Sequence, residues 1–186
     1  PAYGLRELGV VIHDEDVSRV TGEPGLVAEM TLGELRELDI IGGGKIPTLT
    51  QAIALFNDQV ELNIEVKVSG LEDELVKLLT TVKEESDKGV LVSCFDYAVL
   101  ERIKALSSSL PIAFLTVDLE EAKEAILKEE IDALHPLHTI VYDELVVMAH
   151  DHDITVNVWT VDDPARMAEL IALGVNGICS NRPDVL

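Results

Sequence analysis

Short apolar, β-branched runs alternate with longer amphipathic segments along most of the chain. Most of the short runs are apolar on both faces, as strands of a parallel sheet are when helices cover them. We therefore expect strands at residues 9–13, 61–68, 90–95, 111–117, 131–135, 155–161 and 177–179.

The longer segments predict helices, because their apolar residues recur at spacings of three and four. Within residues 72–85, for example, Leu75, Leu79 and Val82 lie on one stripe. Asp163 stands directly before a proline, which is typical of a helix N-cap followed by the first turn. The helices are expected at residues 48–56, 72–85, 97–106, 119–129, 143–150 and 165–173.

Alternating strands and helices favour an α/β fold with a parallel sheet. Six strand–helix units without a glycine-rich nucleotide turn predict a TIM-type (β/α) barrel rather than a doubly wound sheet. A complete barrel of eight strands typically needs roughly 250 residues, and this chain has 186. Hydrophobic residues make up 47%, which is enough for a sizeable core, and no linker interrupts the pattern. We expect one domain spanning residues 1–186, with six of the eight barrel strands visible.

The charge balance narrows the classes of partner. The chain has 35 acidic and 14 basic residues, for a formal net charge of −21. So acidic a chain lacks the basic surface that binding to nucleic acid or to an anionic membrane requires. Any phosphate must then be held locally, by a metal ion or by a few placed cations. No apolar run reaches the length of about 18 residues that a membrane span requires.

The two cysteines, Cys94 and Cys179, each lie inside an apolar run. They lack the spacing of a metal site or a redox pair, so two buried thiols in a reducing compartment are expected. This favours a cytoplasmic location. The chain begins at Pro1 without a methionine, which leaves a removed signal segment open.

Candidate chemistry lies where predicted strands end, since parallel barrels carry their active sites there. His13 and Asp14 follow the apolar run at residues 10–12. Histidine titrates near neutral pH, so this pair suits general acid–base work. A surface histidine in a turn is the equally weighted alternative.

A polar face is predicted on the next strand. Asn63, Glu65 and Lys67 alternate with apolar residues, so in a strand they point the same way. We expect this face to line the barrel lumen, where Glu65 could hold a divalent cation and Lys67 could contact a phosphate. An edge strand with an ordinary surface ion pair is the alternative. Trp159, the single tryptophan, either walls a pocket or belongs to the core, and composition alone favours the core.

An ordered set of motifs resembles the glycerophosphodiester phosphodiesterase family, a group of phospholipase C-like TIM barrels. Each motif is modest, but together they cover essentially the whole chain with suitable spacing. They are His13-Asp14 with residues 15–22, the Thr-Leu-x-Glu-Leu pattern at 31–35, residues 46–49, Asn63-Ile64-Glu65-Val66-Lys67, residues 93–96, Trp159-Thr160-Val161, and residues 174–178 and 181–183.

The resemblance implies hydrolysis of glycerophosphodiesters to glycerol 3-phosphate and an alcohol, with Mg²⁺ or Ca²⁺ as cofactor. By the same resemblance, His13 is one of two catalytic histidines and Glu65 a metal ligand. Lys67 is the cation near the phosphate. Trp159 is an aromatic wall of the substrate site, and Phe95 is a weaker candidate for the same role.

The chain departs from the family pattern at its start. The family's opening His-Arg-Gly strand, its Pro-Glu-Asn-Thr segment and its Glu-x-Asp strand do not occur here. We therefore expect that the first two barrel strands are missing, together with one catalytic histidine and two metal-binding carboxylates. The alternative function is a catalytically silent barrel fragment that binds a ligand or a partner. The sequence leaves the oligomeric state open.

Overall fold

The computed structural model describes residues 9–56, 59–85 and 88–185. One six-stranded sheet dominates it, with its strands in chain order and every pairing parallel. The strands are β1 (Leu62–Glu65), β2 (Val90–Cys94), β3 (Ile112–Thr116), β4 (Ala133–Pro136), β5 (Thr155–Val158) and β6 (Gly177–Ile178). Six of the predicted strands are thus confirmed, with shorter ends.

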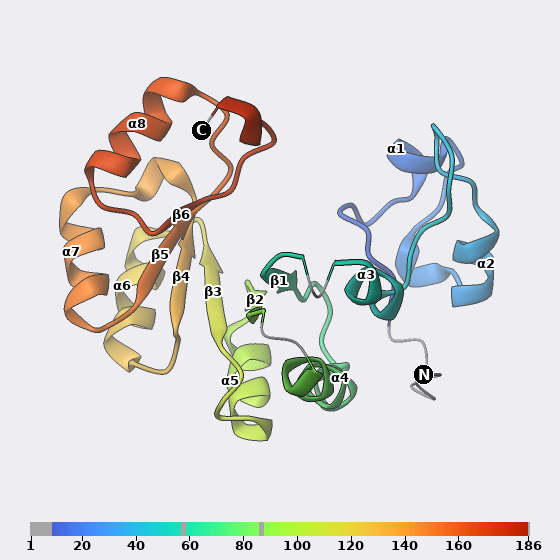
Figure 1. Cartoon of the computed structure of the whole chain (residues 1–186), viewed down its shortest axis with the longest axis horizontal. Coiled ribbons are helices and arrows are strands. Elements are labelled where there is room, and N and C mark those ends of the chain that lie inside the picture. Colours follow the sequence, from blue (N-terminus) through green and yellow to red (C-terminus); the bar gives the residue numbers. More distant parts are fainter. Residues whose placement is uncertain (1–8, 57–58, 86–87, 186) are drawn as a thin grey trace.

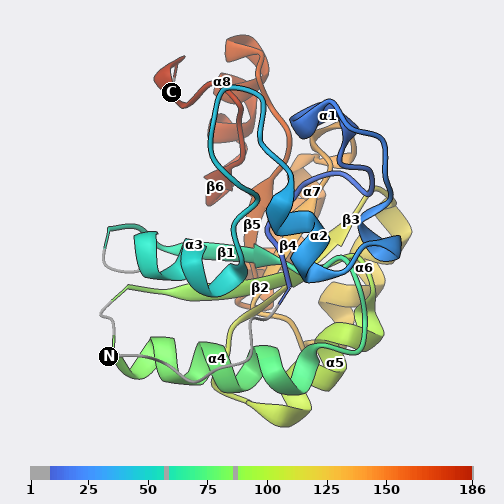
Figure 2. The same ribbon diagram turned by 90° about the vertical axis from the view of Figure 1, so that its right-hand side faces the viewer.

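A helix follows each of the first five strands, so the parallel sheet is built from strand–helix–strand crossover units. Figures 1 and 2 show these helices on the outer face of a curved sheet, which forms a half-barrel. Helix α3 (Leu49–Phe56) precedes β1. The others are α4 (Glu72–Glu85), α5 (Tyr97–Leu106), α6 (Leu119–Lys128), α7 (Asp143–Asp151) and α8 (Pro164–Ala172), with short 3₁₀ turns at η2 (His138–Ile140) and η3 (Pro183–Val185).

The main hydrophobic core lies between the sheet and these helices. Val92, Leu134 and Val156 point into it, together with the apolar stripes of α4 to α8. Because side chains alternate along a strand, the neighbours of these residues face the inside of the curved sheet. His135 on β4 and Asn157 on β5 are two such inward residues.

The sheet does not close on itself among the described residues. The outer strands β1 and β6 each pair with a single neighbour. The fold is therefore six strands of a TIM-type barrel, as the sequence predicted. Within the residues described, no helix combines the length and the apolar character needed to cross a bilayer.

Residues 9–48, which we call the N-terminal lobe, lie to one side of the half-barrel (Figure 1). The lobe contains α1 (Ser18–Thr21), η1 (Val27–Glu29) and α2 (Leu32–Glu37). It has a separate small core in which Val17, Leu35 and Ile46 are buried.

The strand predicted at residues 9–13 is wrong. Val10 makes only an isolated antiparallel bridge with Thr48, and the segment otherwise runs as a loop. An apolar run signals burial but not a hydrogen-bonded ladder, and here Val10 and Ile12 pack against the small core of the lobe instead.

Candidate active site

Parallel strands bring their carboxyl ends to one rim of the half-barrel, and two predicted site residues lie there. Glu65 is the last residue of β1, and Lys67 follows two positions later. Lys67 Nζ lies 2.8 Å from Glu65 Oε1, which makes an ion pair. The predicted alternation of the polar face is confirmed over residues 62–65.

The ion pair on that face is partly exposed. The side chains of Glu65 and Lys67 retain 32% and 40% of their accessible surface. β1 is an edge strand among the described residues, so nothing on its far side encloses them. The pair is therefore spared the large desolvation cost that a closed lumen would impose.

Two aromatic side chains meet at the same rim. Phe95 follows β2, Trp159 follows β5, and their ring centroids are 5.6 Å apart in an edge-to-face arrangement at 88°. Trp159 is half-buried and Phe95 is exposed. The structure thus brings these two predicted substrate-binding residues together, with an open aromatic surface at the rim.

His13 reaches the site from the lobe rather than from a strand end. Its Nδ1 lies 2.7 Å from Asp14 Oδ1, and the other oxygen of Asp14 accepts a hydrogen bond from Arg19 Nε. The Arg19 guanidinium first, and then His13, lower the pKa of Asp14 to about 2. The carboxylate is ionised and can only accept, so Nδ1 of His13 donates, and Nε2 has no hydrogen-bond partner among the described residues.

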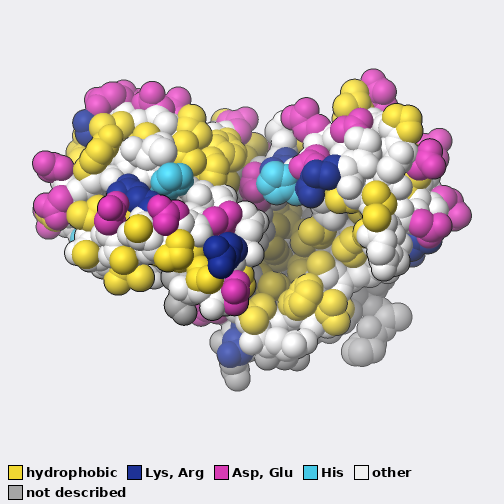
Figure 3. Space-filling view, turned by 90° about the horizontal axis from the view of Figure 1, so that it is seen from above, with side chains coloured by type: hydrophobic (Ala, Val, Ile, Leu, Met, Phe, Trp, Pro, Cys, Tyr) yellow, Lys and Arg dark blue, Asp and Glu magenta, His cyan; other side chains and the backbone are white. Residues whose placement is uncertain are grey.

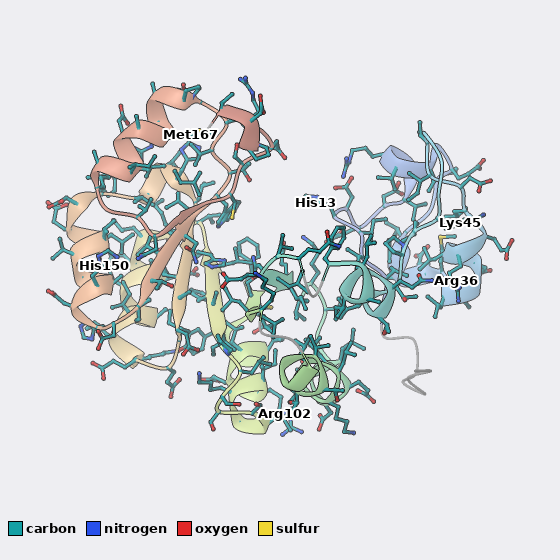
Figure 4. The ribbon with its side chains drawn as sticks, viewed as in Figure 1. His13, Arg36, Lys45, Arg102, His150 and Met167 are labelled. Carbon is teal, nitrogen blue, oxygen red and sulfur yellow. The ribbon has the colours of Figure 1, made fainter. Side chains whose placement is uncertain are left out.

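The lobe and the half-barrel enclose a hollow. In Figure 4, His13 lies on the side of the lobe that faces the half-barrel. Seen from above in Figure 3, the space between the two parts is hollowed and has hydrophobic side chains over its floor. β1, which carries Glu65, is the strand of the half-barrel that lies toward the lobe in Figure 1. The candidate residues therefore approach one space from opposite sides.

Sequence reasoning did not assign a role to His135 and Asn157. His135 is 2% exposed, and its Nε2 lies 3.0 Å from Asn157 Nδ2. Burial lowers the pKa of His135 to about 4. The backbone oxygen of His135 accepts a hydrogen bond of 2.7 Å from Trp159 Nε1. The sequence did contain an indication of them, because each is a polar residue near the end of a strand, one position from an apolar residue that faces the core.

The described residues supply only part of a metal site. Glu65 is a single carboxylate at the rim, and no group of three His, Cys, Asp or Glu side chains able to hold a metal ion occurs within residues 9–56, 59–85 and 88–185. Ca²⁺ and Mg²⁺ ordinarily take about six or more oxygen ligands, including several from carboxylates or water. These residues alone do not fit a divalent cation.

The expected burial is confirmed for one cysteine and is wrong for the other. Cys94 is buried and its Sγ donates to the backbone oxygen of Val66 at 3.0 Å, whereas Cys179 is exposed at the end of β6. Burial raises the pKa of the Cys94 thiol. Cys94 is therefore a structural thiol beneath the β1 end.

A cavity of about 510 Å³ lies between the turns that follow β4 and β5. Its charged residues are already engaged. Arg166 donates to the backbone oxygens of His138 and Val141, and Asp162 accepts from Ser180 and Asn181. With these groups satisfied internally, the cavity does not compete with the rim as the candidate site.

Comparisons with known proteins identify the family. The sequence model described as "Glycerophosphoryl diester phosphodiesterase family" matches residues 8–185. A glycerophosphodiester phosphodiesterase of Caldanaerobacter subterraneus is 33% identical over 192 residues, covering 95% of this chain and 78% of that protein. One from Bacillus subtilis is 27% identical over 208 residues, covering 95% of this chain and 70% of that protein.

Solved structures extend the likeness to the fold. An Oleispira antarctica phosphodiesterase, solved in complex with the product sn-glycerol-3-phosphate, superposes with a TM-score of 0.78 at 26% identity. The match covers 94% of this chain and 76% of that one.

Proposed function

The chain belongs to the glycerophosphoryl diester phosphodiesterase family, and we propose that it hydrolyses glycerophosphodiesters to glycerol 3-phosphate and an alcohol. One observation carries the proposal: the half-exposed Glu65–Lys67 pair and the Phe95–Trp159 ring pair occupy the same rim. A cation beside an open aromatic surface suits a ligand with a phosphate and a carbon backbone. The product in the Oleispira structure is of this kind.

Lys67 is the proposed contact for the phosphodiester. Its ammonium has three N–H donors, and Glu65 Oε1 accepts one of them at 2.8 Å. The others are directed to the non-bridging phosphate oxygens, where a fixed positive charge stabilises the charge that develops in the transition state. With a net charge of −21, the chain needs such a local cation to hold a phosphate.

His13 is the proposed acid–base group. Hydrolysis takes one proton from the attacking oxygen and returns one to the leaving alkoxide, so a histidine beside the phosphorus can serve either transfer. Asp14 holds Nδ1 and thereby presents Nε2. Because the pKa of Asp14 is about 2, the carboxylate stays charged and stabilises the imidazolium that forms when Nε2 takes a proton.

Phe95 and Trp159 are the proposed wall against which the glycerol carbons lie. Their edge-to-face geometry presents one ring face and one ring edge at the rim. Apolar contact with the carbon chain orients the phosphate toward Lys67 without adding charge.

Mg²⁺ or Ca²⁺ remains part of the proposal as the family's cofactor, with Glu65 as one ligand. A bound divalent cation would neutralise phosphate charge as a Lewis acid. Since the described residues provide a single carboxylate there, no step of the mechanism above passes through the ion.

The central test compares two histidine–carboxylate pairs in the full chain. We expect His13→Ala to reduce the release of glycerol 3-phosphate by about 10²- to 10⁴-fold, the range typical of a lost general acid or base. His152→Ala is the matched control, because His152 Nδ1 pairs with Glu129 Oε1 at 2.8 Å just after α7, at the opposite end of the sheet. It should leave the rate unchanged.

Two other results would redirect the assignment. Near-normal turnover in His13→Ala would exclude His13 as acid or base. No hydrolysis by the unaltered chain, across a panel of glycerophosphodiesters with different alcohols and with Mg²⁺ or Ca²⁺ added, would favour the silent, ligand-binding alternative. Loss of turnover with a chelator, and its recovery with one of the two ions, would establish the metal requirement.

A further inference from the structure

A buried polar contact lies directly behind the aromatic wall. His135 on β4 and Asn157 on β5 face the inside of the half-barrel and are linked at 3.0 Å between Nε2 and Nδ2. An amide nitrogen only donates, so Nε2 must accept and the imidazole must be neutral. The low pKa of His135, about 4 because of burial, agrees with a neutral ring at physiological pH.

The same residue fixes the tryptophan. Trp159 Nε1 donates to the backbone oxygen of His135 at 2.7 Å. The backbone of Trp159 is held at this point too, since its N–H donates to Pro136 and its carbonyl accepts from His138. Within the part of the chain that the structure describes, the indole ring has one hydrogen bond, to His135, and one aromatic neighbour, Phe95.

Gly177 on β6 makes room for this arrangement. A Cβ atom at Gly177 would lie 2.5 Å from Asn157 Oδ1 and 3.2 Å from its Cγ. Asn157 and Gly177 are register partners, so the clash is with the neighbouring side chain on the same face. A side chain at this position would push the amide away from His135. Gly177, Asn157, His135 and Trp159 thus form one line of contacts across three strands.

We propose that His135 is a positioning residue for the substrate site: its imidazole, held by Asn157, anchors the β4 end whose carbonyl orients the Trp159 indole. The substrate part of this inference rests on the proposed function. His135 is 2% exposed behind the wall, so it acts through Trp159 rather than by touching substrate. Removing the ring would leave the Asn157 amide without its acceptor and a void beneath the strand end.

Tryptophan fluorescence reports on the surroundings of Trp159 alone, because it is the single tryptophan in the chain. We expect His135→Ala to shift the tryptophan emission to longer wavelength and to increase quenching by acrylamide. His135→Gln, which keeps an acceptor for Asn157, should restore both signals most of the way. Gly177→Ala should change them as His135→Ala does without altering His135 or Trp159, and the double variant should add little more.

Kinetics test the link to substrate. His135→Ala should raise KM for a glycerophosphodiester about tenfold, the equivalent of one lost hydrogen bond, with kcat little changed. His152→Ala serves as the control for both readouts, and circular dichroism checks that each variant is folded.

The outcomes separate this inference from the proposed function. Unchanged fluorescence in folded His135→Ala and Gly177→Ala would overturn it, whatever the activity. A fluorescence shift with an unchanged KM would overturn the substrate part. An unaltered chain without hydrolysis would refute the proposed function and the substrate part together, while the fluorescence would still decide whether His135 positions Trp159.

Discussion

The half-barrel and the N-terminal lobe position their functional side chains in different ways. In the half-barrel, Glu65 ends a strand and Trp159 directly follows one, so a hydrogen-bonded ladder and a large core determine where they lie. In the lobe, His13 lies on a loop above a core of three buried residues. A site shared by two such parts is only as well ordered as its weaker side.

Local polar contacts replace the ladder in the lobe. Asp14 joins His13 to Arg19, and Asp16 Oδ1 accepts the backbone N–H of Ser18 at 2.7 Å. These groups are exposed or nearly so, and exposed contacts of this kind are individually worth little. We therefore infer that the lobe loses its structure before the half-barrel does, and that hydrolysis is lost with it.

The largest effect should come from the core of the lobe. Ile46 is 2% exposed there, and Ile46→Ala should cost about 2–5 kcal/mol, which is a large share of what so small a core supplies. We expect hydrolysis to be lost while the thermal transition of the half-barrel is retained. Amide hydrogen exchange would show loss of protection confined to residues 9–48.

Ile126→Ala is the matched control, because Ile126 on α6 is fully buried in the main core. The same substitution there should lower the main transition and leave protection in the lobe unchanged at low temperature. If both variants instead lower one common transition, the lobe and the half-barrel unfold as a unit and the contrast drawn above is wrong.

The contrast also explains which predictions from sequence succeeded. The two-residue spacing of polar side chains predicted the alternation over residues 62–65, and short apolar runs between amphipathic segments predicted the strands from β2 to β6. The same reasoning failed at residues 9–13, where an apolar run packs as a loop against Ile46 and its neighbours. The hydrophobic pattern of the sequence identifies which residues are buried, but hydrogen bonding to a distant segment decides whether a buried run becomes a strand.

The contacts of the candidate site also fall into those that the local sequence predicts and those that depend on the three-dimensional arrangement. Lys67 and Glu65 were predictable as neighbours because two-residue spacing along a strand brings them together. The contact between Phe95 and Trp159 depends on sheet curvature across four strands, which no local pattern contains. How exposed Glu65 is could not be predicted for a related reason, because the exposure of an edge strand depends on what lies beside it.

An intermediate effect should follow from pH. The pKa of His135 is about 4 in the folded chain against an ordinary value of 6.5, so between these values the unfolded chain binds more protons. Stability is therefore fully present above pH 6.5 and is lost as the pH falls toward 4. The loss should reach about 2 kcal/mol at about pH 5. Urea unfolding at about pH 7.5 and pH 5 measures it, and His135→Gln should remove most of the difference.

The lobe should behave differently over this interval. The pKa of Asp14 is held near 2 by Arg19 and His13, so its carboxylate stays ionised until the solution is far more acidic. Hydrogen exchange in residues 9–48 should thus change little between those two pH values. Equal weakening of both parts at about pH 5 would show that groups other than His135 dominate the acid response.

The smallest effects should come from two helix caps, and they sharpen the comparison most directly. Asp118 accepts the N–H groups of Glu120 and Glu121 at the start of α6 in the half-barrel. Thr31 accepts from Glu34 in the capping box of α2 in the lobe. Replacing either cap with alanine should cost about 1 kcal/mol locally. For Asp118→Ala, we expect the melting temperature to fall by about 2–4 °C and the rate of hydrolysis to stay the same.

Thr31→Ala removes a similar amount of local stabilisation from the lobe, whose small core makes it less stable than the half-barrel. α2 contributes Leu35 to the three-residue core, so fraying of its first turn weakens the support of the loop that carries His13. The main melting transition should barely move, whereas the rate of glycerol 3-phosphate release should fall several-fold, because about 1 kcal/mol corresponds to roughly a fivefold change in a local equilibrium. Equal rates in the two variants would mean that the lobe holds His13 as firmly as the half-barrel holds Trp159. A rate lost only in Thr31→Ala would place the limit on catalysis in the stability of the lobe.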